Sequence, residues 1–255
     1  MKERLTGIIK KNQQLVDGIF EMTLSVDTIS NEATVGQFVN LYSIRKDLLL
    51  PRPISICEID KENGQIKLVY AVVGKGTADF SQMQEGDSIQ MMGPFGNGFT
   101  ISEDTKEHVV VGGGIGVPPL LELVKRLKGD ISVYLGFRCD PILVKEFRMY
   151  TDKVYVATED GSNGVKGNVI DLLHKHPPKA TMIYSCGPKP MLKAVADWSK
   201  EKKIEAQLSM EERMACGIGA CLVCTCKSKK DDDWDYKRVC KDGPVFWRDE
   251  VMWDE

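Results

Sequence analysis

Four of the eight cysteines in this chain have the types and spacing of metal-cluster ligands. Cys216, Cys221 and Cys224 follow one another as C-x4-C-x2-C, and Cys240 comes fifteen residues after Cys224. Three thiolates on one short loop and a fourth from a separate segment are the ligand pattern of a 2Fe-2S cluster. Only small residues and one Ile separate Cys216 from Cys221, so backbone N–H groups there can turn toward the sulfur atoms. The sequence therefore favours Cys216, Cys221, Cys224 and Cys240 as ligands of a 2Fe-2S cluster.

Two other uses of these cysteines agree less well with the spacing. Structural zinc sites also use four cysteines, but usually as two short C-x2-C knuckles, and this segment has one. A disulfide framework is disfavoured because 8 cysteines in 255 residues are sparse and nothing at the N-terminus resembles a secretory signal. We interpret Cys226, Cys57 and Cys139 as packed or spare thiols.

Length and charge restrict the classes of function. A chain of 255 residues is long enough for two domains and a small appendage. The formal net charge of -3 argues against a surface that binds nucleic acid. The charged N-terminus lacks the apolar core of a signal peptide, and no apolar run is long enough to span a membrane. We therefore expect a cytoplasmic protein with reduced thiols.

The first hundred residues consist of short strand-like runs separated by turn residues. An Asn-Gly pair in segment 60–64 lies between two such runs and indicates a hairpin. Several short strands at this spacing predict a small antiparallel barrel. The predicted strands are 18–26, 37–44, 54–59, 66–73 and 88–92.

Two places in the predicted barrel have the residue types that contact nucleotides. Arg52-Pro53-Ile54-Ser55 opens a strand with a guanidinium group, which favours bidentate contact with phosphate. The segment Gly74-Lys75-Gly76-Thr77 supplies flexible backbone amides and a hydroxyl group. Each signal is weak alone, because glycine loops and exposed arginines occur in any barrel. The glycine-rich connector 94–99 then marks a domain boundary.

After this connector, strands and helices alternate, which predicts a parallel sheet with helices on both faces. Pro118 and Pro119 lie where proline is tolerated, in the first turn of a helix whose apolar residues recur at helical spacing. The predicted strands are 108–111, 131–135, 154–157, 182–185 and 205–208.

Three glycine turns follow strands of this sheet and are candidates for a nucleotide crevice. They are Gly112-Gly113-Gly114-Ile115-Gly116, the turn at 159–161, and Cys186-Gly187-Pro188. The first turn has Val117 where the third glycine of the usual dinucleotide fingerprint would stand, so the fingerprint alone is weak. We interpret all three histidines, at positions 108, 174 and 176, as surface groups and assign them no role.

The order of these parts resembles the ferredoxin-reductase-like flavoproteins, and within them the electron-transfer subunits of class 1B dihydroorotate dehydrogenases. The resemblance covers essentially the whole chain. It rests on a barrel with Arg52-Pro-Ile-Ser55, a sheet with Gly-Gly-Gly-Ile-Gly and Cys186-Gly-Pro, and the C-terminal cysteine pattern. It implies an FAD-binding β-barrel domain at 1–99, an NAD-binding α/β domain at 100–209 and a 2Fe-2S domain at 210–255.

The resemblance also implies roles for individual residues. The cluster ligands would be the four cysteines named above, and no residue would act as a catalytic acid or base. The residues implied to bind FAD are Arg52, Pro53, Ile54, Ser55, Val69, Tyr70, Ala71, Gly76 and Thr77. Those implied to receive NADH are Gly112, Gly113, Gly114, Gly116, Cys186, Gly187 and Pro188.

These cofactors explain why such a chain would need no base of its own. NAD(H) gives or takes two electrons as hydride, a 2Fe-2S cluster takes one at a time, and FAD converts between the two. By resemblance the partner is the FMN-containing catalytic subunit of dihydroorotate dehydrogenase, in a heterotetramer of two of each chain that serves pyrimidine (UMP) biosynthesis. The implied function is an oxidoreductase subunit that relays electrons to or from this partner.

Three alternatives stay open at this point. The same relay can serve a different acceptor, and a nucleotide-binding module with structural zinc is a reading from another class of protein. Arg138, after the second strand of the sheet, can meet the 2′-phosphate of NADPH or be a solvated turn residue. The family prefers NADH.

Overall fold

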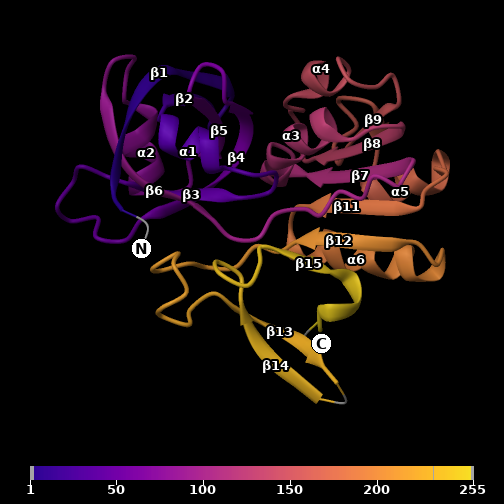
Figure 1. The fold of residues 1–255 in the computed structure, drawn as a ribbon. Coiled ribbons are helices and arrows are strands. Elements are labelled where there is room, and N and C mark those ends of the chain that lie inside the picture. The colour runs from indigo at the N-terminus through magenta and orange to yellow at the C-terminus, as the bar shows by residue number, and fades with distance from the viewer. Residues whose placement is uncertain (1–2, 232, 254–255) are drawn as a thin grey trace.

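The first part of the chain forms a closed six-stranded antiparallel barrel, which confirms the predicted architecture. The computed structural model describes residues 3–231 and 233–253. Around the barrel the strand order is β1-β2-β5-β4-β3-β6 (Figure 1). The strands are β1 Leu5–Val16, β2 Ile19–Ser25, β3 Phe38–Tyr42, β4 Arg52–Asp60, β5 Gln65–Ala71 and β6 Ser88–Phe95, and the helices are α1 Asp27–Glu32 and α2 Lys75–Ser81.

Two features of the barrel differ from the sequence interpretation. Strand β1 was missed because it has few buried residues, among them Gly7 and Ile9, while its second half is largely polar and exposed. The connector predicted at 94–99 begins inside a strand, since Pro94 and Phe95 still belong to β6. The predicted hairpin between β4 and β5 is confirmed, with Asp60 paired to Gln65 across the turn.

The second part is a seven-stranded sheet in the order β10-β9-β8-β7-β11-β12-β15. All neighbours pair in parallel except β12 and β15, which are antiparallel. The strands are β7 Glu107–Gly113, β8 Asp130–Phe137, β9 Val154–Thr158, β10 Val165–Lys166, β11 Met182–Cys186, β12 Glu205–Ser209 and β15 Val245–Trp247. The helices are η1 Gly114–Gly116, α3 Pro119–Arg126, α4 Val144–Phe147, α5 Val169–Lys175 and α6 Lys189–Glu201.

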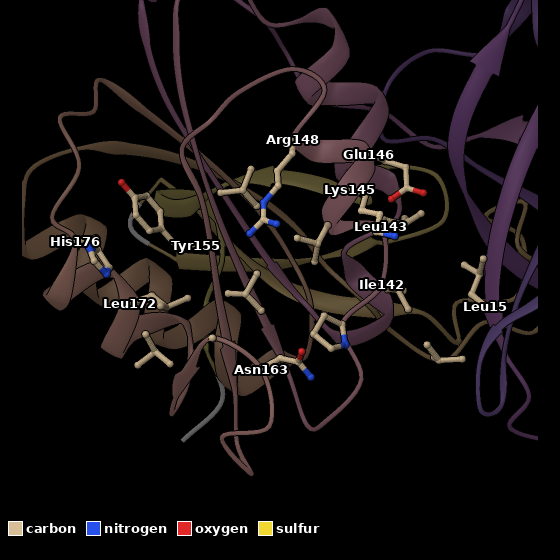
Figure 2. A pocket seen from close by; sticks show the side chains of 17 residues that line it. Leu15, Ile142, Leu143, Lys145, Glu146, Arg148, Tyr155, Asn163, Leu172 and His176 are labelled. Atoms are coloured by element: carbon tan, nitrogen blue, oxygen red, sulfur yellow. The ribbon is translucent and has the colours of Figure 1, made fainter.

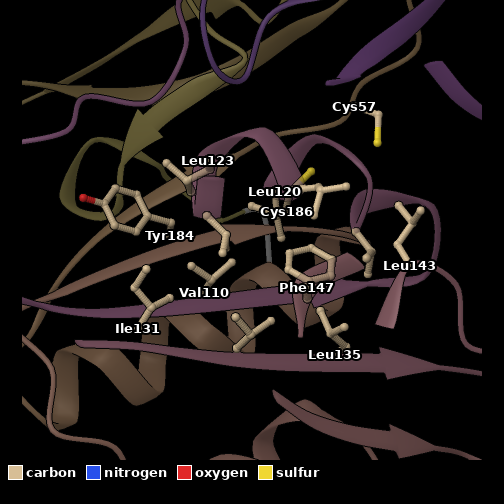
Figure 3. Close-up of a cluster of buried hydrophobic side chains, with 14 of the residues drawn as sticks. Cys57, Val110, Leu120, Leu123, Ile131, Leu135, Leu143, Phe147, Tyr184 and Cys186 are labelled. Atoms are coloured by element: carbon tan, nitrogen blue, oxygen red, sulfur yellow. The ribbon is translucent and has the colours of Figure 1, made fainter. Parts of the chain in front are cut away.

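Helices cover both faces of this sheet, as predicted. Alternate residues of β7 point to opposite sides, because successive side chains of a strand do so. Val110 joins a core with Leu120 of α3, whereas Val109 and Val111 join a core with Leu192 of α6. The α3 core also includes Cys57 of β4, so it crosses from the sheet to the barrel (Figure 3).

His108 is the residue whose placement was predicted wrongly. Only 1% of it is exposed at the start of β7, and its ring stacks on Tyr184 with centroids 5.9 Å apart. Its Nε2 lies 3.0 Å from the carbonyl oxygen of Lys128. A histidine at the start of an apolar strand can be buried when a backbone group hydrogen-bonds to its ring. His174 is exposed, as predicted, and His176 is half-buried against Tyr155.

The C-terminal segment is attached to both other parts. Strands β13 Thr225–Lys230 and β14 Asp233–Arg238 form a separate hairpin, and η2 Arg248–Glu250 follows β15. Strand β15 extends the seven-stranded sheet, because Phe246 of β15 pairs with Leu208 of β12.

No described helix has the combination of length and apolar character that crossing a bilayer would take.

Candidate functional site

A cavity of about 310 Å³ lies where the barrel, the sheet and the C-terminal segment meet. It brings together predicted residues from both domains, which are far apart in the sequence. From the barrel come Arg52, Pro53, Ile54, Ser55, Val69, Tyr70, Ala71 and Thr77, and from the sheet come Gly116, Cys186 and Gly187. We call this space the flavin-side cavity, after the residues predicted to line it.

Arg52 is held at this cavity by its neighbours. Its Nη1 donates to the carbonyl oxygen of Leu50, and its guanidinium lies against Gly76. A Cβ at Gly76 would lie 2.5 Å from Nε of Arg52, so glycine is needed for this close approach. The Thr77 hydroxyl accepts from the backbone N–H of Val73 at 3.0 Å and donates to the carbonyl of Gly74. Gly76 and Thr77 therefore shape the turn that supports Arg52.

Tyr70 lines the cavity in a different way from its neighbours. Its ring is in the barrel core with 1% exposed, and its hydroxyl donates to Oδ1 of Asn12 at 3.1 Å. Burial raises the pKa of this hydroxyl to about 12. Because side chains alternate along β5, Val69 faces the α3 core instead. Tyr70 therefore lies at the cavity while its hydroxyl is engaged by Asn12.

A second cavity, of about 920 Å³, lies at the carboxyl ends of β7, β8, β9 and β11. Ligands of parallel sheets bind at this edge. Its lining includes three of the predicted nucleotide residues, Gly113, Gly114 and Pro188, together with Arg138 and Glu159. We call it the strand-end cavity. The residues predicted to receive NADH are thus divided between this cavity and the flavin-side cavity.

Two of the predicted glycines, Gly112 and Gly116, allow neighbouring segments to pack closely. A Cβ at Gly116 would lie 2.6 Å from Cα of Gly187, so only glycine lets these two turns touch. A Cβ at Gly112 would lie 2.9 Å from Cγ2 of Val117. Gly112 lines neither of the two cavities, and its role in the structure is the close approach of β7 to the following helix.

Sequence reasoning missed several cavity residues. No local signal in the sequence marks Asp17 or Ile19, which reach the strand-end cavity from the barrel. The residues missed at the flavin-side cavity are Phe38, Val73, Ile115, Ser209, Met210, Glu211, Glu212, Met214 and Pro244. Those from Met210 to Met214 directly precede the cysteine loop, and this proximity is the one signal that points to them.

Backbone N–H groups link the segments that carry the four predicted ligand cysteines. The N–H of Cys240 donates to Sγ of Cys224 at 3.5 Å, and the N–H of Ile218 donates to Sγ of Cys216 at 3.5 Å. Cys221 is exposed and Cys216 half-buried, whereas Cys224 and Cys240 are buried. A 2Fe-2S cluster takes four thiolates, so three cysteines on one loop and a fourth from the following segment are a donor set that suits it.

Backbone N–H groups of the loop point at these sulfur atoms, as the small residues predict. Gly219 donates to Sγ of Cys240 at 3.1 Å, and Ala220 donates to Sγ of Cys216 at 3.4 Å. Burial alone would raise the pKa of Cys216, but donation from Ile218, Cys221 and Ala220 lowers it to about 6. Burial, with Cys224 nearby, raises the pKa of Cys240 to about 12.

Within residues 3–231 and 233–253, no group of three or more His, Cys, Asp or Glu side chains converges as the ligands of one ion do. A zinc ion needs four ligands around one point. The features that favour a two-iron cluster are the C-x4-C-x2-C spacing and the inward N–H groups.

The cysteine loop contacts the barrel close to the flavin-side cavity. Nδ2 of Asn40, on β3, donates to the carbonyl oxygen of Cys216 at 3.3 Å. On the other side of the loop, the backbone N–H of Asn97 donates to the carbonyl of Gly243 at 2.6 Å. Met214 of the same segment lines the cavity itself. The start of the cysteine loop is therefore close to the cavity that Arg52 lines, since Met214 in its wall is two residues before Cys216.

A third cavity, of about 620 Å³, lies at the edge of the sheet (Figure 2). Residues of α4 and β9 form its walls, and Arg148, Lys145 and His176 lie around it. Leu15 and Val16 approach it from the barrel. None of the predicted site residues lines this cavity.

Comparison with known proteins identifies the family. Residues 211–252 match the family model of the iron-sulfur cluster binding domain of dihydroorotate dehydrogenase B. A protein of Caldanaerobacter subterraneus subsp. tengcongensis is 40% identical over 253 residues, which are 99% of this chain and 100% of the relative. It is named dihydroorotate dehydrogenase B (NAD(+)), electron transfer subunit. This chain belongs to that family.

Other members of the family agree. The electron transfer subunit of Listeria monocytogenes (serotype 4b) is 44% identical over 245 residues, covering 93% of this chain and 94% of the relative. That of Clostridium perfringens is 41% identical over 250 residues, covering 96% of each. The resemblance inferred from the sequence is thereby confirmed, and with it the role of an oxidoreductase electron transfer subunit.

Solved structures confirm the ferredoxin-reductase-like fold of this family member. A chain of an NADH-dependent reduced ferredoxin-NADP oxidoreductase superimposes with a TM-score of 0.87 at 30% identity, covering 97% of this chain and 90% of the other. Phthalate dioxygenase reductase has a TM-score of 0.62 at 16% identity, covering 93% and 77%, and supports the fold alone.

Proposed function

We propose that this chain carries electrons between NAD(H) and the catalytic subunit of a dihydroorotate dehydrogenase, with FAD in the flavin-side cavity and a 2Fe-2S cluster on Cys216, Cys221, Cys224 and Cys240. The observation that carries the proposal is one junction. Arg52 to Ser55 of the barrel, Gly116 and Gly187 of the sheet, and Met214 of the cysteine segment line a single cavity. Three parts of the chain that are separate in sequence meet there.

Each part has a separate task in this proposal. We assign residues 1–99 to FAD, 100–209 to the nucleotide and 210–255 to the cluster. FAD, when bound, accepts hydride and releases single electrons. The chain's own residues bind and orient the groups. Arg52 supplies a positive fork for phosphate, and the turns at Gly113 and Gly187 let a dinucleotide approach the backbone closely.

The proposal needs no protein acid or base at the junction. The thiol nearest the expected chemistry, Cys186, is 9% exposed, and burial raises its pKa to about 12, so it stays protonated. We propose that oxidation of dihydroorotate, with its own base, takes place in an FMN-containing partner. A heterotetramer of two chains of each kind is the assembly we expect.

The experiment is to purify the chain anaerobically and assay it alone and with its partner. We expect FAD, iron and labile sulfide, NADH-dependent reduction of an artificial acceptor such as ferricyanide, and no dihydroorotate turnover until the catalytic subunit is added. Colourless protein loaded with zinc would end the relay proposal. Dihydroorotate oxidation by the chain alone would show that the division of labour between subunits is wrong.

The competing function is electron transfer to or from a different partner. The solved structure with 30% identity is named as a ferredoxin-NADP oxidoreductase, which makes a ferredoxin the partner to test. The same preparation tests it. Faster reduction of a ferredoxin than of the dihydroorotate dehydrogenase catalytic subunit would favour that acceptor.

A further inference from the structure

The far end of β4 runs past its partner β3 in the closed barrel, and a carboxylate from the other domain caps the edge of β4 there. Strand β3 pairs with only the first part of β4, from the pair Leu41 and Arg52 to the pair Phe38 and Ser55. Further along β4, the backbone N–H of Ile59 donates to Oε2 of Glu122 at 3.0 Å. Glu122 belongs to α3, which covers the sheet. One side chain of the α/β domain thus satisfies a backbone donor of the barrel.

Glu122 is buried to an extent that is rare for a carboxylate. Only 1% of the residue is exposed. Its Oε1 accepts from Nε of Arg126 at 2.6 Å, and Nζ of Lys125 lies 3.7 Å from its Oε2. Lys125 also lies 3.6 Å from Oε1 of Glu58, next to Ile59. Buried carboxylates persist when both oxygens have partners, and here the partners come from both domains.

The two elements that Glu122 joins have their other ends at the flavin-side cavity. Strand β4 begins at Arg52, which lines that cavity. Helix α3 follows the turn that contains Ile115 and Gly116, which line it too. Any rotation of α3 against β4 therefore moves the two walls of the cavity relative to each other.

Besides this hydrogen bond and the ion pair of Lys125 with Glu58, apolar side chains make up much of the contact between α3 and β4. Cys57 of β4 belongs to the same apolar core as Leu120 and Leu143 and lies at its barrel side (Figure 3). Apolar contact is not directional and tolerates small sliding movements. A hydrogen bond to one particular backbone N–H fixes the register of the helix on the strand.

We propose that Glu122 is a positioning residue: by holding α3 on the far end of β4, it sets the orientation of a nucleotide on the sheet relative to a flavin on the barrel. This inference rests on the proposed function, since it concerns the geometry of hydride transfer. It adds a residue outside the cavity lining to the residues that determine the rate of hydride transfer. Glu122 lines neither the flavin-side cavity nor the strand-end cavity.

The test compares Glu122→Ala, which removes the contact, with Glu122→Gln, whose amide oxygen can still accept from Ile59. Val195→Ala is the matched control, because Val195 is fully buried on α6, in the core on the other face of the sheet. The first measurement is the rate of flavin bleaching by NADH in stopped flow, over a range of NADH concentrations. The second is amide hydrogen exchange at Ile59 in protein without NADH.

We expect Glu122→Ala to lower the bleaching rate at saturating NADH by about ten- to a hundredfold, since small misplacements of reacting groups have effects of this size. The NADH concentration for half-saturation should stay the same, because the strand-end cavity is intact. Exchange at Ile59 should accelerate. Glu122→Gln should restore the rate to within about twofold and the protection of Ile59, and Val195→Ala should lose stability but not rate.

Each contrary result has a distinct meaning. An unchanged saturating rate in Glu122→Ala with full flavin content would overturn the positioning role. A loss of rate in Val195→Ala as large as that in Glu122→Ala would reduce the effect to general destabilisation and overturn it too. If NADH fails to bleach the wild-type flavin at all, the proposed function is wrong, and that outcome is distinguishable from failure of Glu122.

Discussion

The cysteines show how one residue type acquires different chemistry from its surroundings. Backbone N–H groups, acting against burial, lower the pKa of Cys216 to about 6. Burial raises the pKa of Cys226 to about 11 and that of Cys57 well above its usual value. The pKa does not by itself separate ligands from packing residues, because burial also raises the pKa of the proposed ligand Cys240 to about 12. The distinction rests on the C-x4-C-x2-C spacing and on the N–H groups that point at the ligand sulfurs. Cys226 and Cys57 are buried, as packed thiols would be, while Cys139 is exposed.

The first prediction separates ligands from the neighbouring thiol. Cys216→Ala should abolish the visible absorption of the iron-sulfur cluster, because the cluster loses one of four ligands. Cys226→Ala should keep that absorption and lose only some stability, since Cys226 fills space on β13. Absorption spectra and iron content of both variants decide this. Equal loss of iron in the two variants would show that the ligand set includes Cys226.

The second prediction concerns Arg52 and the flavin. A charged hydrogen bond is worth about 1.5–3 kcal/mol, so Arg52→Ala should weaken FAD binding by about one to two orders of magnitude. Arg45→Ala is the control, because Arg45 lies in the same loop region but pairs with Asp47 at 2.8 Å on the surface. FAD content after dialysis is the measurement. Flavin retention equal to that of the Arg45 variant would contradict the assignment of Arg52.

Strand β7 carries a buried titratable group, the imidazole of His108. His108 is buried beneath Tyr184, and burial lowers the pKa of its imidazole below the ordinary 6.5. The unfolded chain therefore takes up a proton at a higher pH than the folded chain does. The free energy of unfolding must then fall as the pH drops below about 6.5, until the folded-state pKa is passed.

The third prediction follows from this burial. His108→Gln should show a weaker loss of stability between about pH 7 and pH 5 than the wild type, because the titrating group is gone. His174→Gln, at an exposed position of α5, should keep the wild-type pH dependence. Denaturant unfolding at several pH values measures both. A steeper pH dependence in the His108 variant would reverse the sign of the argument.

For the molecule as a whole, the order of barrel, sheet and cysteine segment was predictable, because strand periodicity and cysteine spacing are local signals. The burial of His108, the inward ring of Tyr70 and the approach of Asp17 to the strand-end cavity were not predictable. Each depends on which surface another element presents, and no window of neighbouring residues contains that information. The same limit applies to Glu122, which reads as an ordinary helix-surface residue in sequence.

The pairing of β15 with β12 has a consequence for modularity. Cutting the chain after Ser209 would remove Val245 and Phe246, the partners of Ser209 and Leu208, and would leave an open sheet edge. Uncovered edges are templates for aggregation. Although the cysteine segment looks like an appendage that could be transplanted, it completes the sheet of its host. In this protein the C-terminal segment that the sequence sets apart is not a separate folding unit. A cluster segment transplanted to another protein would need a host sheet whose edge strand can pair with β15.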